Sequence, residues 1–236
     1  MKCNIYRMSN LEFKQLSHKV RFKERKFKFT QNQIDFLKTA LDSETKLMFL
    51  SGPAGTAKTY MAVYSALQML MDANLEKGIL YIRSIAESAQ RSMGALPGSL
   101  EEKFAVFASP FYDKLDEMLN ASDIKILREK NMFDCMPVNY VRGANWDDTI
   151  VIIDEAQNFS YSELVTVLTR IGEDSKIIIC GDIMQSDINN SGFTEIFKTF
   201  DSEDSVENGV ICKQFTTADI KRSKIVKFIV SKLENN

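Results

Sequence analysis

Short apolar runs alternate along the chain with segments whose apolar residues recur every three or four positions. The runs lack the in-and-out alternation of a strand with one exposed face, so they predict strands that are buried on both faces. They lie within residues 46–52, 78–84, 147–157, 175–182 and 209–215. The periodic segments predict helices, of which the first and the last are expected to be capped by Thr30 and Thr216. They lie at residues 30–43, 59–74, 161–172 and 216–235.

Strands and helices in this order predict an α/β fold, with a mostly parallel sheet that carries helices on both faces. The stretch around 85–135 is predicted to be a helical insertion into this fold. It is expected to break where Gly94, Pro97 and Gly98 cluster, because glycine and proline interrupt helices.

Three other features complete this organisation. A short strand is predicted at 138–143, and the acidic stretch 201–209 is predicted to be an exposed loop. The chain is expected to consist of a basic N-terminal segment, residues 1–29, and a single domain, residues 30–236.

Composition limits the class of protein. A chain of 236 residues with 44% hydrophobic and 26% charged residues can bury a sizeable core and is typical of globular proteins. No apolar run is long enough to span a membrane, and the first residues lack the apolar core of a secretory signal, so we expect a cytoplasmic protein. The formal net charge of −2 means that nucleic-acid binding would require a local basic patch.

The four cysteines are scattered, which favours reduced thiols over disulfides or a zinc site. The single histidine, His18, has no partner motif and is assigned no role. The cysteines are Cys3, Cys135, Cys180 and Cys212.

Residues 52–59, "GPAGTAKT", join the first predicted strand to a helix with the spacing of a phosphate-binding P-loop. In such a loop, backbone N–H groups and the positive end of the helix hold the phosphates. Lys58 is expected to reach the β- and γ-phosphates of ATP, and the Thr59 hydroxyl to bind Mg²⁺. The residues expected to contact the nucleotide are Gly52, Pro53, Ala54, Gly55, Thr56, Ala57, Lys58, Thr59 and Tyr60.

Ala57 occupies the position where a P-loop usually has its last glycine. If the backbone has a positive φ there, the Cβ atom costs about 1 kcal/mol. This penalty is small beside the many phosphate contacts, so nucleotide binding is expected to survive. Taken alone, the stretch is also compatible with an ordinary strand–turn–helix junction that contains glycine and lysine.

Asp154 and Glu155 end a predicted buried strand in "TIVIIDEAQ". At the carboxyl end of a parallel strand, both acids lie in the crevice where open α/β sheets bind ligands. Asp154 is expected to hold Mg²⁺, and Glu155 to act as the general base on the water that attacks the γ-phosphate. Gln157 is a candidate for reporting the state of that phosphate. The alternative is a strand end with two solvated acids.

The next predicted strand delivers Asp182 and then Gln185, in "IIICGDIMQ". The Gln185 amide could hydrogen-bond the γ-phosphate or the attacking water, and so couple hydrolysis to movement. A surface turn is an equally good interpretation of these residues alone. Because the three motifs occur in order at predicted strand ends, together they favour a nucleotide site.

The motifs "GPAGTAKT", "IVIIDEAQ" and "GDIMQSD" together resemble those of the PhoH-like family, which is close to the first RecA-type domain of superfamily-one helicases. The similarity covers about residues 28–233, and "YVRGANWDDT" and "DIKRSKIVKFIV" agree with the family as well. Ala57 and Ser223, where the family often has histidine, depart from its pattern. The resemblance implies a RecA-like P-loop ATPase fold with an extra strand between the P-loop strand and the acidic strand. It also implies a helicase-like motor or remodeller that uses ATP and Mg²⁺.

The resemblance suggests roles for two further residues. Gln33 resembles the glutamine that such helicases place ahead of the P-loop, where its amide would pair with adenine; the alternative is a polar residue in a helix's first turn. Arg222 is the candidate arginine finger, offered to a neighbour's site in a hexameric ring such as similar proteins form; the alternative is a solvated helix face. Such a finger is worth about 10³-fold in rate. The rival arginines are Arg83, Arg142 and Arg170.

Two stretches suggest contact with single-stranded RNA or DNA. Residues 14–28 hold seven basic residues and one acidic residue, with Phe22 and Phe27 among them, so they could neutralise phosphates and stack on bases. The structural alternative for this stretch is an edge strand that buries the two phenylalanines, and both interpretations stay open. For the tryptophan of the second stretch we favour the structural alternative, a position in the core. That second stretch contains Tyr140, Arg142 and Trp146.

Two other functions are compatible with a P-loop. A small-molecule or nucleotide kinase must exclude water, so a glutamate placed to activate water directly after the magnesium aspartate argues against it. A non-catalytic nucleotide-binding module would fit a decayed loop. Against decay stand the retained residues Lys58, Thr59, Asp154, Glu155 and Gln185.

Overall fold

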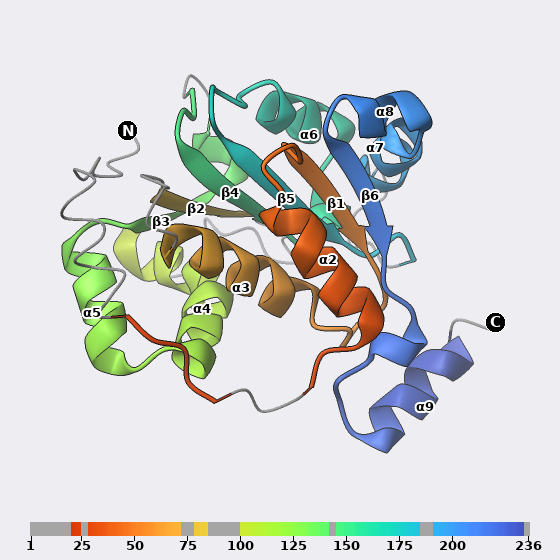
Figure 1. Ribbon diagram of the computed structural model, residues 1–236, viewed down its shortest axis with the longest axis horizontal. Coiled ribbons are helices and arrows are strands. Elements are labelled where there is room, and N and C mark those ends of the chain that lie inside the picture. The colour runs from red at the N-terminus through yellow and green to blue at the C-terminus, as the bar shows by residue number, and fades with distance from the viewer. Residues whose placement is uncertain are drawn as a thin grey trace.

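A sheet whose neighbouring strands are all parallel forms the centre of the computed structural model (Figure 1). The structure describes residues 20–24, 28–71, 78–84, 100–141, 145–184 and 191–233. Over these residues the sheet has six strands in the order β3-β2-β4-β5-β1-β6. The strands are β1 (Leu47–Ser51), β2 (Gly78–Arg83), β3 (Phe133–Pro137), β4 (Thr149–Asp154), β5 (Lys176–Gly181) and β6 (Val210–Gln214).

Helices cover both faces of the sheet (Figure 1). Buried side chains of α2, α3, α4 and α5 share a core with one face, and those of α6 and α7 share a core with the other. The α-helices are α2 (Gln31–Leu41), α3 (Lys58–Met71), α4 (Leu100–Met118), α5 (Ala121–Glu129), α6 (Tyr161–Leu168), α7 (Phe193–Phe200), α8 (Glu203–Glu207) and α9 (Lys224–Leu233). Short 3-10 turns are η2 (Val138–Tyr140), η3 (Ala156–Asn158) and η4 (Thr217–Asp219).

Local sequence signals explain where α2 and α6 begin. The Thr30 side chain accepts the backbone N–H of Gln33, and the Gln33 side chain accepts the N–H of Thr30, which is a capping box. Ser160 and Glu163 form the same arrangement at the start of α6. The expected cap at Thr30 is therefore confirmed.

The central strands are buried on both faces, as their apolar runs predict. In β4, Ile150 and Ile152 pack into the core against α3, while Val151 and Ile153 pack into the core against α6. Because side chains alternate along a strand, Asp154 points to the face that carries α3. This alternation brings the acidic strand end towards the helix that follows the P-loop.

The expected α/β fold of the RecA-like P-loop type is confirmed. Strand β5 lies between β1 and β4, which is the extra strand that the resemblance implies. Since these strands are parallel, their carboxyl ends meet at one edge of the sheet.

The predicted strand at 138–143 is wrong. The strand forms earlier, as β3, and ends at Pro137, which has no N–H with which to continue the ladder. The chain then turns through η2, which is closed by a 3.2 Å hydrogen bond from the Val141 N–H to the Val138 carbonyl. Strand β3 also replaces the last part of the predicted helical stretch 85–135, where α4 and α5 form as expected. The predicted break at 94–99 lies outside the described residues.

The acidic stretch 201–209 is not a loop throughout. It contains the short helix α8, whose first turn carries Glu203 and Asp204. Acidic side chains stabilise the positive N-terminal end of a helix, which explains why this polar stretch turns helical.

The closing helix is shorter than predicted. Thr216 does not cap this helix as expected but caps the 3-10 turn η4: its side chain accepts the Ala218 N–H at 3.3 Å, and Asp219 accepts the Thr216 backbone N–H at 2.8 Å. Helix α9 begins only at Lys224, so Arg222 precedes this helix instead of lying in it. Figure 1 shows α9 apart from the helices that cover the sheet.

The two aromatic stretches that suggested nucleic-acid contact are partly explained by packing. Trp146 is 2% exposed, which confirms the expected core position. The Phe22 ring lies 4.7 Å from that of Tyr64, and Phe22 forms an isolated bridge with Leu119, so it packs onto the core. Phe27 and residues 1–19 lie outside the described residues. Over the residues described, no helix combines the length and apolar character needed to cross a membrane.

Candidate nucleotide site

The P-loop connects β1 to α3 in two left-handed steps. Gly55 has a φ of 84° and Ala57 a φ of 67°, so the positive φ considered for Ala57 is present. The Lys58 ammonium folds back onto the loop and donates to the carbonyls of Gly52 at 2.5 Å and Pro53 at 3.2 Å. The Thr56 hydroxyl donates to the Pro53 carbonyl at 2.8 Å. These bonds hold the loop in a turn around the start of α3.

Residues 215–222, here called the C-terminal segment, lie directly against this loop. A Cβ atom at Gly52 would lie 2.9 Å from the Phe215 Cβ, and one at Gly55 would lie 3.0 Å from the Arg222 Cγ. The Lys221 N–H donates to the Gly55 carbonyl at 2.9 Å. Gly52 is therefore required for the close approach of this segment, and Gly55 both for close approach and for its left-handed backbone.

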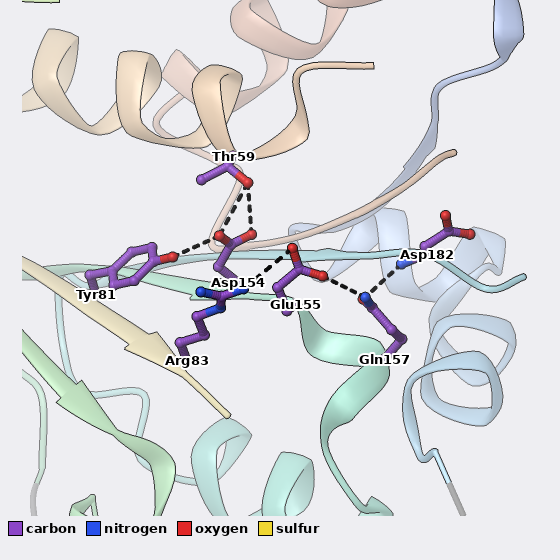
Figure 2. Close-up of polar contacts among 7 residues, drawn as sticks. All are labelled: Thr59, Tyr81, Arg83, Asp154, Glu155, Gln157 and Asp182. Atoms are coloured by element: carbon purple, nitrogen blue, oxygen red, sulfur yellow. Dashed lines mark hydrogen bonds and ion pairs between the residues drawn. The ribbon is translucent and has the colours of Figure 1, made fainter. Parts of the chain in front are cut away.

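Asp154 is held by two hydroxyl groups from different elements, as Figure 2 shows. The Thr59 hydroxyl, in the first turn of α3, lies 2.9 Å from Asp154 Oδ1 and 3.1 Å from Oδ2. The Tyr81 hydroxyl, from β2, donates to Oδ2 at 2.7 Å. The P-loop helix and the acidic strand end are thus in direct contact.

Burial sets the electrostatics of this pair. Burial and the neighbouring Glu155 carboxylate raise the pKa of Asp154, while hydrogen bonds from Tyr81 and Thr59 oppose that rise. Burial and the Asp154 charge raise the pKa of Tyr81 well above its ordinary value, so its hydroxyl keeps its proton and donates. A buried carboxylate with hydroxyl donors is a strong site for a cation that would neutralise it.

Glu155 is held at both carboxylate oxygens (Figure 2). Its backbone is left-handed, with a φ of 53°, where β4 gives way to η3. The Arg83 guanidinium lies 3.8 Å from Oε1, and the Gln157 amide donates to Oε2 at 2.6 Å. The Gln157 side-chain oxygen in turn accepts the Asp182 N–H at 3.0 Å, which links Glu155 to the end of β5.

A pocket of about 510 Å³ opens over these residues. Its volume lies in the range of sites that hold nucleotide-sized ligands. Helix α4 contributes Lys114 and Glu117, and the C-terminal segment contributes Lys221 and Arg222. The other lining residues are Ala54, Gly55, Ala57, Lys58, Thr59, Tyr60, Glu155, Gln157 and Asp182.

Two oxygen donors at this pocket fit Mg²⁺: Thr59, which lines the pocket, and Asp154, which is bonded to Thr59 but is 3% exposed and not itself a lining residue. A magnesium ion is commonly bound by one or two protein oxygens together with the phosphates of its nucleotide. Thr59 and Asp154 supply a hydroxyl and a carboxylate side by side. Among the described residues, no group of three His, Cys, Asp or Glu side chains could hold a metal by itself. The arrangement therefore suits a metal that arrives with a nucleotide.

Gln33 lies beside the P-loop, but not in the pocket. Its side chain is completely buried, and its amide donates to the Thr56 carbonyl at 3.0 Å and to the Asp219 carbonyl at 3.2 Å. Its oxygen accepts the Thr30 N–H at 3.0 Å. In this geometry the amide ties α2, the P-loop and η4 together, and the adenine contact stays a prediction.

The candidate arginines are separated by the structure. Arg222 lines the pocket of its own chain, next to Gly55, whereas a role in a neighbour's site was expected. Arg83 pairs with Glu155, and Arg170 is not among the residues that line the pocket. Arg142 and Gln185 lie outside the described residues.

Sequence reasoning missed Tyr81 and assigned Arg83 a different task. Tyr81 sits within a strand and belongs to no motif, so only the pairing of β2 with β4 reveals its position. Lys114, Glu117 and Lys221 were missed for a similar reason. Which face of α4 turns to the loop, and where the chain turns after η4, depend on tertiary packing.

Comparison with known proteins places the chain in a family. The profile of the PhoH-like protein family matches residues 27–234, almost the whole chain. The chain belongs to the PhoH-like protein family.

Other PhoH-like proteins are similar over much of this chain. A PhoH-like protein of Bacillus subtilis is 42% identical over 142 residues, which is 60% of this chain and 44% of that protein. A PhoH-like protein of Synechocystis is 37% identical over 191 residues, 80% of this chain and 56% of that protein. Protein PhoH of Escherichia coli is 32% identical over 198 residues, 82% of this chain and 54% of that protein. This chain spans about half the length of these relatives.

Solved structures that resemble this PhoH-like chain include the Pif1 helicase from Candida albicans. The TM-score is 0.39 and the sequence identity 19%, with 80% of this chain and 40% of that chain covered.

Proposed function

We propose that this chain binds ATP with Mg²⁺ in the pocket and hydrolyses it. The observation that carries the proposal is the contact between Thr59 and Asp154, at 2.9 and 3.1 Å, with Lys58 and Glu155 as their chain neighbours. Four residue types of a P-loop ATPase thereby meet at one edge of the sheet. A chance strand–turn–helix junction would not join the acidic strand end to the loop.

The residues divide the work according to their positions. Backbone N–H groups at the start of α3 hold the phosphates, and Lys58 exchanges its loop carbonyls for phosphate oxygens. Thr59 and Asp154 hold Mg²⁺, which when bound neutralises charge that develops on the phosphates. Glu155 polarises the attacking water, because it follows the metal carboxylate and lines the pocket.

Glu155 must be released before it can act as a base. Gln157 occupies Oε2 and Arg83 lies near Oε1, so the carboxylate is restrained in the form seen here. Gln157 also contacts the backbone at Asp182. Binding of a γ-phosphate in the pocket would compete for these groups, which supports a role for Gln157 as the residue that reports the nucleotide state.

Arg222 is proposed to act on the nucleotide of its own chain. Its side chain lines the same pocket as Lys58, and its Cγ approaches the P-loop at Gly55. A guanidinium at this place stabilises charge on the phosphates without a neighbour. The homo-oligomeric, hexameric ring that the resemblance implies is kept as a separate proposal.

Single-stranded RNA or DNA is the proposed polymer on which the ATPase acts. Family resemblance to helicases supports this, together with two aromatic side chains at the carboxyl edge of the sheet. Tyr140 follows β3 and Tyr161 follows β4, and each is 47% exposed. Exposed aromatic rings stack on unpaired bases without sequence preference.

Nucleotide binding can be tested separately from hydrolysis. Wild type and Glu155→Gln should bind ATP with Mg²⁺ in isothermal titration calorimetry with similar affinity, because Glu155 acts on water. Lys58→Ala should bind at least about tenfold more weakly, since it loses a charged contact to the phosphates. A wild type that binds no ATP would contradict the proposal.

The polymer is tested by phosphate release at low salt with and without single-stranded RNA or DNA. The polymer is expected to stimulate hydrolysis. A Tyr140→Ala, Tyr161→Ala double variant should keep the basal rate of hydrolysis but lose most of this stimulation. Phe228→Ala, an exposed aromatic on α9, is the matched control. No binding and no stimulation by either polymer would refute the nucleic-acid part alone.

A further inference from the structure

We propose that Tyr81 is the positioning residue of the magnesium carboxylate: its hydroxyl holds Asp154 so that Asp154 and Thr59 present their oxygens to Mg²⁺ together. This inference rests on the proposed function, because it assigns a task within the nucleotide site. Tyr81 belongs to neither the P-loop nor the acidic motif, and it is not among the residues that line the pocket. It would therefore act only through Asp154.

The hydroxyl contact is short and shielded. Tyr81 donates to Asp154 Oδ2 at 2.7 Å, a length typical of a hydroxyl bonded to a charged carboxylate (Figure 2). Both side chains are buried, with Tyr81 1% and Asp154 3% exposed. Because little solvent reaches the pair, loss of the hydroxyl would leave Oδ2 with only the longer, 3.1 Å contact from Thr59, and no water would replace the lost donor.

Strand register places the tyrosine at the required distance. Tyr81 pairs with Ile152 of β4, and Asp154 lies two residues further along on the same face. Two residues span about 6.6 Å along a strand, which a tyrosine bridges from its backbone to its hydroxyl. Arg83, directly opposite Asp154, turns instead towards Glu155. Residue 81 is thus the position on β2 from which a long side chain meets this carboxylate.

Packing fixes the ring. Tyr81 lies in the core against α3 and α4, and its ring centroid is 5.2 Å from that of Phe111, which is completely buried. Because neighbouring side chains restrain the ring, its hydroxyl stays at one place on the carboxylate. The orientation of Asp154 is then set before any ligand binds.

Thr59 and Tyr81 differ in what else they must do. Thr59 contacts both oxygens of Asp154, but it also lines the pocket and is the expected second ligand of Mg²⁺. Tyr81 contacts Oδ2 alone. It can therefore go on holding the carboxylate when Thr59 turns to the metal.

The test is Tyr81→Phe, which keeps the packed ring and removes only the hydroxyl. Binding of a fluorescent ADP derivative to the full chain is measured in EDTA and then across a series of MgCl₂ concentrations. Affinity in EDTA should stay within about twofold of wild type, while half-maximal tightening should require about tenfold more Mg²⁺. Tyr64→Phe is the matched control, because that hydroxyl contacts Gln68 within α3 and Tyr64 is not among the pocket-lining residues.

The outcomes separate this inference from the function beneath it. If wild type shows Mg²⁺-dependent tightening and Tyr81→Phe shows the same Mg²⁺ requirement, the role of Tyr81 is refuted and the nucleotide site stands. If wild type binds no nucleotide in either condition, the proposed function fails and this inference fails with it. A Tyr81→Phe chain that loses affinity equally in EDTA and in Mg²⁺ would show a merely structural role, and would also refute the proposal.

Discussion

Ala57 belongs to the P-loop motif and has a strained, left-handed backbone conformation. Its φ of 67° lies where glycine is favoured, next to Gly55 at 84°. The P-loop spacing predicts this conformation, because the motif usually has glycine there. The side chain also packs against the core beside α3. The loop therefore tolerates a left-handed alanine at a cost that the rest of the fold offsets.

Ala57→Gly should raise the free energy of unfolding by about 1 kcal/mol, because it removes the Cβ from a left-handed position. Chemical denaturation measures this. Ala66→Gly, in the middle of α3, is the matched control and should lower the free energy of unfolding by about 1 kcal/mol or more. Equal destabilisation by both substitutions would show that Ala57 is not strained.

At this scale, the clustering of the motif residues could be predicted, but the residues that support them could not. Lys58, Thr59, Asp154 and Glu155 belong to motifs whose spacing signals their contacts. Tyr81 is an ordinary strand residue in the sequence. Its contact with Asp154 depends on the register of β2 against β4, and register between distant strands leaves no local pattern.

Between elements, the junction of α2, the P-loop and η4 stands out. Gln33 joins all three through backbone carbonyls, and Asp219 joins two of them through its carboxylate. That carboxylate accepts from Thr30 at 2.5 Å, from Asn32 at 3.0 Å and from the Thr216 N–H at 2.8 Å. The C-terminal segment is thereby fixed against the P-loop. The sequence pattern predicts Thr30 and Thr216 as caps, but not that both bond to the same carboxylate, that of Asp219.

Gln33→Ala separates the two interpretations of this residue. It should lower the free energy of unfolding by about 2 to 4 kcal/mol, because buried backbone groups lose their partner. Affinities for ATP and GTP should change by the same factor. Gln31→Ala, an exposed neighbour on α2, should change stability by less than about 0.5 kcal/mol. Loss of ATP affinity alone, at unchanged stability, would favour adenine recognition instead.

Asp219 makes a pH-dependent contribution to this junction. Burial alone would raise the pKa of its carboxyl, but hydrogen bonds from Thr216, Thr30 and Asn32 lower the pKa below its ordinary value. A lowered pKa in the folded state means that the stabilisation is present above about pH 4 and is lost as the pH falls below that value.

Asp219→Asn should therefore cost about 1 to 3 kcal/mol at pH 7 and progressively less below pH 4. Denaturation of both chains across this pH range measures the difference. Asp42→Asn, at an exposed position just after α2, is the control and should show little difference at any pH. A difference that persists undiminished in acid would contradict the assignment.

At the scale of the whole molecule, the strand and helix order could be predicted, while the irregular connections could not. Apolar runs mark β1, β2, β4 and β5 because those strands are buried on both faces. The run that predicts β6 is also found as a strand, but β6 lies at the edge of the sheet and is only half-buried, so the expected burial on both faces is wrong there. The strand predicted at 138–143 forms earlier, as β3. Its true bounds depend on pairing with β2, which the local sequence around Pro137 does not reveal. Whether Arg222 reaches the pocket of its own chain also depends on how the chain turns after η4, which no local pattern indicates.

Mixing Lys58→Ala chains with Arg222→Ala chains tests whether sites are completed within one chain. Each variant alone should hydrolyse ATP far more slowly than wild type, with Arg222→Ala slower by about 10³-fold. The mixture should regain no activity, because Arg222 lines the pocket of its own chain. Recovery of activity would show that a ring shares this arginine between neighbours.

The most direct measurement is the rate of phosphate release from ATP in a single turnover, for wild type and Glu155→Gln side by side. The wild type should release phosphate only with Mg²⁺, and Glu155→Gln should be slower by about 10²-fold while it still binds ATP. A wild type that binds ATP but never releases phosphate, or a Glu155→Gln chain that releases it at the wild-type rate, would contradict hydrolysis at this site.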